Sequence, residues 1–249
     1  MSTMSNSTVM ICLFGIIFGN YAAFSSYSQI TSIPIALISI LLMNKIARQM
    51  GQKASMMTGT YGGIIGSIII TLFLVFVNPR GDASKFAIPA FRIIRPDTWG
   101  TLFTGWSAVG LIFILLVIAW RGVQALSSSI VITMTADCAD YEVYRTGKYV
   151  PGLMGTLFSF VDKLVSSFAP MVAGVMFSMC GYTDHNPVMG DPVTPGLRGG
   201  VVFCAYGMIM IGLVCNLIAM KFYPLTKEKM EEIQDEVAQI KMKTMAENA

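Results

Sequence analysis

The stretch "MMTGTYGGIIGSIIITLFLVFV", residues 56–77, carries no charged residue over 22 positions. An α-helix of about 20 apolar residues crosses the hydrocarbon layer of a bilayer, because each residue adds about 1.5 Å. The run lacks the alternation of polar and apolar residues that is typical of membrane β-barrel strands. It therefore predicts a membrane-spanning helix, and an all-α membrane protein.

The rest of the chain repeats this pattern. The 249 residues are 54% hydrophobic and 12% charged, about half the usual charged share, which argues against a soluble protein with buried helices. A transmembrane bundle over 1–223 is expected, followed by a polar helical tail over 224–249. The predicted spans are about 25–44, 55–78, 104–136, 151–180 and 199–222, preceded by an apolar stub at 9–19 that reaches about half a bilayer.

The reactive residue types form no catalytic or metal-binding pattern. The single histidine, His185, lies in a predicted loop, and no nucleophile elbow, phosphate loop or zinc helix is present. The cysteines lack paired spacing and are interpreted as small buried hydrophobes. We therefore expect no enzyme, no metal, no cofactor and no nucleic-acid partner. The cysteines are Cys12, Cys138, Cys180, Cys204 and Cys215.

Charged residues between the apolar runs predict the orientation. Two predicted loops, 44–53 and 137–148, share one side with the tail from Lys221, and together they hold ten lysines and arginines. The loops on the other side, 79–98 and 181–198, hold five. By the positive-inside rule, the chain is expected to be a multi-pass cell-membrane protein with a cytoplasmic carboxyl terminus.

Two basic residues interrupt the apolar runs at similar depth. Arg121 lies 16 residues before Asp137, about 24 Å of helix, and Lys163 lies 15 residues after Lys148, about 22 Å. A charge at this depth costs roughly 3 kcal/mol, so it needs a partner or a water-filled cavity. Asp162 is the neighbour of Lys163, but adjacent helical side chains point about 100° apart. Two interpretations remain open: an ion pair that fixes helix packing, or a substrate cavity.

Polar and aromatic residues near these charges extend the candidate substrate site. The Gln124 amide suits a hydroxylated ligand, and Trp120 either stacks on a sugar ring or packs in the core. The small residues either contact substrate or allow close helix packing. The candidate substrate-binding residues are Lys163, Arg121, Gln124, Trp120, Ser128 and Ser159.

A longer motif covers "TADCADYEVYRTGKYVPGLMGTLFSFVDKLVSSFAP", residues 135–170. It contains Ala-Asp-x-x-Asp-Tyr, a short basic glycine turn and a helix with a lysine, and it resembles the glycoside–pentoside–hexuronide:cation symporters. These form the melibiose-permease-like branch of the major facilitator superfamily. The run 33–53 and the tail "FYPLTKEKMEEI" (222–233) resemble the same family. The matching residues include Ala136, Asp137, Asp140, Tyr141, Arg145, Gly147, Lys148 and Lys163.

The resemblance implies the carboxyl-terminal six-helix half of a major-facilitator fold with a truncated first helix. It implies symport of a sugar or glycoside with sodium or protons, by alternating access around a midplane site. The family's acidic cation-site residues belong to the amino-terminal half, so none is assigned here. The family often has an acid just before Gly152, whereas this chain has Pro151.

The charges at the start of this motif, between residues 137 and 148, have two interpretations. They form salt bridges with the other half that break when the cavity opens inward, or they are solvated and only set the topology. The candidate gate residues are Asp137, Asp140, Tyr141, Arg145 and Lys148.

Two functions therefore remain open from the sequence. The first is sugar symport together with a matching amino-terminal half, with two fixed cations favouring an anionic sugar. The second is a truncated, non-transporting membrane fragment, or a half that needs a partner chain.

Overall fold

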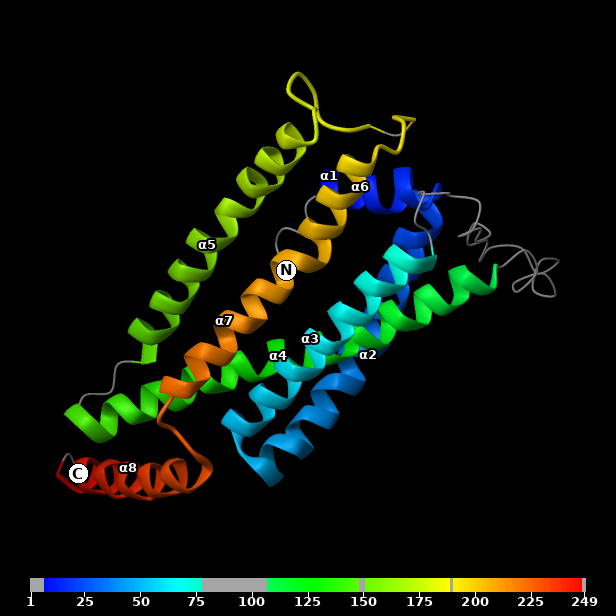
Figure 1. Cartoon of the computed structure of the whole chain (residues 1–249). Coiled ribbons are helices and arrows are strands. Elements are labelled where there is room, and N and C mark those ends of the chain that lie inside the picture. The colour runs from blue at the N-terminus through cyan, green and yellow to red at the C-terminus, as the bar shows by residue number, and fades with distance from the viewer. Residues whose placement is uncertain (1–6, 78–106, 148–150, 189, 248–249) are drawn as a thin grey trace.

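The computed structural model describes residues 7–77, 107–147, 151–188 and 190–247 (Figure 1). All regular structure in these ranges is helical, so the predicted all-α fold is confirmed. The elements are α1 (Ser7–Met10), the π-helix η1 (Ile11–Ile17), α2 (Tyr21–Met50), α3 (Gln52–Val77), α4 (Ala108–Thr146), α5 (Pro151–Met179), α6 (Pro195–Val202), the π-helix η4 (Phe203–Gly207), α7 (Met208–Phe222) and α8 (Lys227–Glu247).

Four of the described helices are long and apolar enough to cross a membrane. They are α3, α4, α5 from Gly152, and the rod Pro195–Phe222 formed by α6, η4 and α7. Helix α2 has 30 residues but is not among the four. The stub expected at 9–19 overlaps the short helix Ser7–Ile17, which ends two residues earlier. These lengths fit a multi-pass membrane protein.

Two segments expected to be loops are instead helical. Helices α2 and α3 are separated only by Gly51, whose φ of +82° lies in the left-handed region that glycine tolerates. Helix α4 continues through the predicted loop 137–148 as far as Thr146 and ends at Gly147, with φ of +68°. The predictions were wrong here because charged residues do not stop a helix, whereas a left-handed glycine does.

Helices α2, α3 and α4 pack side by side, and α7 lies along α3 (Figure 1). Their shared core is rich in aromatic rings at the end where η1 lies. The ring of Phe18 lies 4.6 Å from Phe113 and 4.9 Å from Phe24, measured between centroids. Such offset ring contacts connect η1, α2 and α4 into one apolar cluster.

Helices α3 and α4 approach closely because glycines line α3. A Cβ atom added to Gly66 would lie 2.6 Å from Cδ1 of Trp120, and one added to Gly59 would lie 2.4 Å from Oγ of Ser127. Both distances are shorter than a van der Waals contact, so each glycine makes room for a specific side chain of α4. Small residues at such positions are what allow membrane helices to pack without an intervening side-chain layer.

Helix α5 lies apart from the other helices along most of its length (Figure 1). Its buried residues, Ala169, Ala173 and Phe177, lie in its final turns, and Ala173 and Phe177 join the main core. The preceding turns expose large apolar side chains such as Leu153, Phe160 and Val165. The first two-thirds of α5 therefore present an apolar surface that the described part of the chain leaves uncovered.

Candidate functional site

Arg121 is a basic side chain that the structure places inside the helix bundle. It lies on α4, and its Nη1 donates hydrogen bonds to the backbone oxygen of Ser28, at 3.1 Å, and to the Ser28 hydroxyl on α2. The same two helices are also joined by the Ser39 hydroxyl, which donates to the carbonyl of Gly122 at 3.1 Å. Arg121 is therefore held at the α2–α4 contact by two acceptors from a single residue.

Among the residues that the structure describes, Arg121 has no acidic counter-ion. A cavity of about 20 Å³ beside it is lined by aromatic, aliphatic and hydroxyl side chains, and no acidic residue lines it. Elsewhere in the described chain, the ion pairs are those within α8. An unneutralised guanidinium in apolar surroundings has a strong affinity for an anion. The lining residues are Phe14, Phe24, Tyr27, Ser28, Thr31, Phe113, Ile114, Val117, Ile118 and Arg121.

Trp120 and Gln124 lie in the contact between α3 and α4, both about 3% exposed. The indole nitrogen of Trp120 donates to the Ser67 hydroxyl at 2.9 Å and to the carbonyl of Gly63 at 3.2 Å. Its ring meets the Tyr206 ring edge-on at 5.5 Å between centroids. Trp120 thus has the environment of a packed core residue in this structure.

The Gln124 amide, one turn further along α4, also faces the contact between α3 and α4. A Cβ on Gly63 would lie 3.2 Å from its Oε1 atom, while its Nε2 atom has no protein hydrogen-bond partner. A buried amide without a partner costs roughly 1–3 kcal/mol. Such a group is paired most easily by a water molecule or by a polar ligand.

The remaining candidate substrate residues are exposed. Lys163 and Ser159 lie on the uncovered part of α5, with Asp162 beside Lys163. Ser128 is exposed on α4, and its hydroxyl donates to the carbonyl of Gln124 within the same helix. No described contact joins Lys163 to Arg121, because Arg121 points toward α2 and not toward α5. The two basic groups are therefore not brought together in this chain.

The charged motif forms the last turns of α4, where α8 packs; we call this end of the bundle the tail end. Asp137 is buried there at 6% exposure, Asp140 and Tyr141 are partly buried, and Arg145 is exposed. Lys148 lies outside the described residues. The rings of Tyr141 and Tyr144 stack at 6.3 Å, and Val143 packs against the buried Ile233 of α8. The motif is therefore a helical surface partly covered by the tail.

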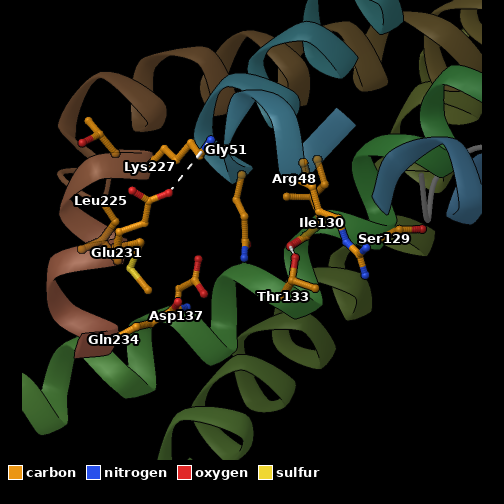
Figure 2. Close-up of a pocket in the computed structure, with 14 residues that line it drawn as sticks. Arg48, Gly51, Ser129, Ile130, Thr133, Asp137, Leu225, Lys227, Glu231 and Gln234 are labelled. Atoms are coloured by element: carbon orange, nitrogen blue, oxygen red, sulfur yellow. Dashed lines mark hydrogen bonds and ion pairs between the residues drawn. The ribbon is translucent and has the colours of Figure 1, made fainter. Parts of the chain in front are cut away.

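A pocket of about 350 Å³ opens at the tail end between the α2–α3 turn, α4 and α8 (Figure 2). The side chain of Asp137 rises from α4 into it, and Lys227 and Glu231 face it from α8. The Oε1 atom of Gln52, also in the lining, is buried without a hydrogen-bond partner. The pocket thus combines both charge signs with an unpaired acceptor. Its other lining residues include Arg48, Gly51, Ser129, Thr133, Thr226 and Gln234.

Hydrogen bonds to backbone carbonyls attach the tail to this end. Lys53 donates to the carbonyl of Tyr223, and Lys227 donates to that of Gln49 at 3.4 Å. A Cβ on Gly51 would lie 2.9 Å from Cβ of Lys227, so the start of α8 rests directly on the turn. Burial raises the pKa of the Tyr223 phenol, which lies between α7 and α8.

Sequence reasoning missed Ser28 and Ser39, which make hydrogen bonds between helices. Ser28 lies in the run "SSYSQITS" (25–32), where no charge or spacing distinguishes one hydroxyl from the next. Ser25 and Ser32 in the same run donate only to carbonyls of their own helix. The signal that separates Ser28 from them is its position opposite Arg121, which only a three-dimensional arrangement supplies.

The described residues contain no cluster of three or more His, Cys, Asp or Glu side chains that could hold a metal ion. All five cysteines are free thiols. The groups that the described site does offer are a guanidinium and hydrogen-bonding side chains between helices.

Comparison with known proteins gives a consistent result. The sequence profile described as "MFS/sugar transport protein" matches residues 4–227. The chain is 29% identical over 160 residues to a glucuronide carrier protein homolog of Escherichia coli, covering 63% of this chain and 33% of the relative. It is 27% identical over 137 residues to a putative sulfoquinovose importer of Salmonella typhimurium, covering 55% and 28%. A putative sulfoquinovose importer of Escherichia coli is 28% identical over 115 residues.

The matched region spans a third or less of the length of these relatives. No solved structure matches the chain.

Proposed function

The chain belongs to the MFS/sugar transport protein family, and from this premise we propose that it is the carboxyl-terminal half of a sugar:cation symporter. It would act with an amino-terminal half and move a sugar or glycoside with sodium or protons by alternating access. The prediction that the chain is not an enzyme is confirmed, because its family and its relatives are transport proteins. The uncovered apolar face of α5 supports a second half, since it offers a surface for further helices.

The proposed substrate is an anionic sugar. The observation that carries this is Arg121, a guanidinium within the helix bundle with no acidic neighbour in its cavity. The named solutes of the relatives agree, because a glucuronide carries a carboxylate and sulfoquinovose carries a sulfonate. Charge-assisted hydrogen bonds to such groups are roughly twice as strong as neutral ones.

Lys163 is proposed as a second substrate contact, or as the partner of an acid from the other half. Its exposure on α5 leaves it available to either. Gln124, Ser128 and Ser159 would contribute hydrogen bonds to sugar hydroxyls, and Trp120 would support them from the core. The coupling ion is expected to bind in the amino-terminal half.

The tail end is proposed to face the cytoplasm, following the distribution of lysines and arginines. Asp137, Asp140, Tyr141, Arg145 and Lys148 would then act as a cytoplasmic gate. Asp137 is buried beside a pocket. This position fits a group that pairs with a basic residue of the other half when the cavity is closed to the cytoplasm. A basic partner would stabilise the ionised form of this buried carboxylate.

A non-transporting membrane fragment is the second candidate. It is favoured by the small share of the relatives that the chain covers. Co-expression separates the two: the chain is produced in vesicles alone or with the amino-terminal six helices of a full-length relative. Uptake of methyl β-D-glucuronide only when both parts are present supports symport. Absence of uptake from well-expressed pairs supports the fragment.

In the same assay, Lys163→Gln is expected to lower glucuronide uptake at least about 10-fold, because a charged hydrogen bond contributes about 1.5–3 kcal/mol. Lys221→Gln is the matched control, since Lys221 is exposed at the end of α7. Equal uptake by both variants would remove Lys163 from the site.

A further inference from the structure

Arg121 is anchored through one nitrogen only. Both described hydrogen bonds of its guanidinium leave from Nη1, and both end on Ser28, one on the hydroxyl and one on the backbone oxygen. A guanidinium is a planar fork whose N–H groups also leave from Nε and Nη2. No contact to a protein acceptor is described for these two nitrogens.

Attachment through Nη1 alone fixes the direction in which the rest of the guanidinium points. The guanidinium cannot rotate about its own bonds without breaking two hydrogen bonds to α2, so its free edge keeps a fixed orientation. An edge made of Nε and Nη2 presents two parallel N–H groups, which match the two oxygens of a carboxylate or the oxygens of a sulfonate. A lysine at this position would lack this geometry.

The immediate surroundings restrict what else Arg121 can bind. The adjoining cavity of about 20 Å³ holds roughly one water-sized group, and its walls come from η1, α2 and α4. A pyranose ring does not fit in it, so a sugar would meet the Nε–Nη2 edge through its acidic group and would not occupy this cavity. The acidic group, and not the ring, is therefore the part of a sugar that this arrangement selects.

We propose that Ser28 is a positioning residue for substrate selectivity: it fixes Nη1 of Arg121 so that the Nε–Nη2 edge receives the acidic group of an anionic sugar. The inference rests on the proposed function and deepens it. Fixing the guanidinium before the substrate arrives removes the loss of rotamer freedom from the binding step, which strengthens binding of the charged substrate only.

The test measures the ratio of affinities for methyl β-D-glucuronide and methyl β-D-glucoside, using the chain together with an amino-terminal half. Ser28→Ala removes the hydroxyl and keeps the backbone oxygen. We expect it to lower the glucuronide-to-glucoside affinity ratio about 5- to 10-fold, with glucoside affinity unchanged. Ser28→Thr, which keeps a hydroxyl, is expected to restore the ratio to within about twofold of wild type.

Ser32→Ala is the matched control, because the Ser32 hydroxyl lies one turn further along α2 and donates to the carbonyl of Gln29 within its own helix. A purely structural role for Ser28 would lower uptake of both sugars equally and leave their ratio intact, which would overturn the inference. An unchanged ratio in Ser28→Ala would do the same.

Different outcomes contradict the anionic substrate and the role of Ser28. A wild-type protein that does not distinguish the two sugars would contradict the proposed anionic substrate. A wild-type preference that disappears in Arg121→Gln but persists in Ser28→Ala would leave the proposed function intact and overturn only the role of Ser28.

Discussion

Replacement of Arg121 by glutamine is expected to weaken the binding of an anionic sugar about 100-fold while leaving a neutral glycoside nearly unaffected. The guanidinium is the only basic group described beside the aromatic cavity, and removing one partner of a buried charged hydrogen bond costs about 3 kcal/mol. Glutamine removes the charge and is two bonds shorter than arginine, so the contact to Ser28 is lost, while the Ser39–Gly122 hydrogen bond still joins α2 to α4. The measurement is the concentration dependence of uptake for methyl β-D-glucuronide and methyl β-D-glucoside.

The control for this experiment is Arg198→Gln. Arg198 is also an arginine in an apolar helix, but its Nη2 donates to the carbonyl of Leu74 at 2.6 Å, in another part of the bundle. Its removal is expected to leave the preference between the two sugars intact. Equal transport of uronate and neutral glycoside by wild type and by Arg121→Gln would contradict the anionic-substrate proposal.

Replacement of Gly66 by leucine is expected to destabilise the bundle by about 3 kcal/mol, because overpacking a closely packed contact costs about that amount. Even the first added carbon would lie 2.6 Å from Trp120, whose indole is held by hydrogen bonds to Ser67 and Gly63 and cannot move aside freely. The expected change in melting temperature is a decrease of roughly 6–12 °C. The measurement is thermal unfolding of the detergent-solubilised chain, followed by size-exclusion chromatography after heating.

Gly212→Leu provides the comparison. Gly212 is an exposed glycine of the apolar helix α7, and a Cβ added there meets nothing within 4 Å. The variant therefore shares the change in helix propensity and hydrophobicity but not the clash. If both variants shifted the melting temperature equally, the close approach of α3 and α4 would not explain the effect.

The helices of the fold were largely predictable because their physical signal is local. Runs such as 56–77 are free of charge over a membrane thickness, and the structure has a continuous helix there. The ends of the helices were less predictable. The segment 137–146 contains charges but no glycine or proline, and its apolar residues Ala139 and Val143 recur at helical spacing, so α4 continues until Gly147.

The candidate site was predictable only in part. The depth of Arg121 follows from counting residues, but its partner does not, because the serines near Ser28 are equivalent in sequence. Trp120 illustrates the opposite problem: an aromatic residue beside a buried charge resembles a sugar platform, yet its indole is hydrogen-bonded to α3. Which neighbour satisfies a polar group depends on helix rotation, which hydrophobic runs without a polar face do not specify.

The unequal attachment of the helices has a mechanical consequence. The one-residue connection at Gly51, the Ser39–Gly122 hydrogen bond and the glycine-lined contact make α2, α3 and α4 one rigid unit, whereas α5 is attached through its contacts with α4 and through its final turns and is uncovered between them. A rigid unit moves as a whole, whereas a helix that is uncovered along its middle can shift relative to that unit. Arg121 therefore moves with the α2–α3–α4 unit and Lys163 with the uncovered part of α5. The distance between these two positive charges changes when α5 shifts relative to that unit.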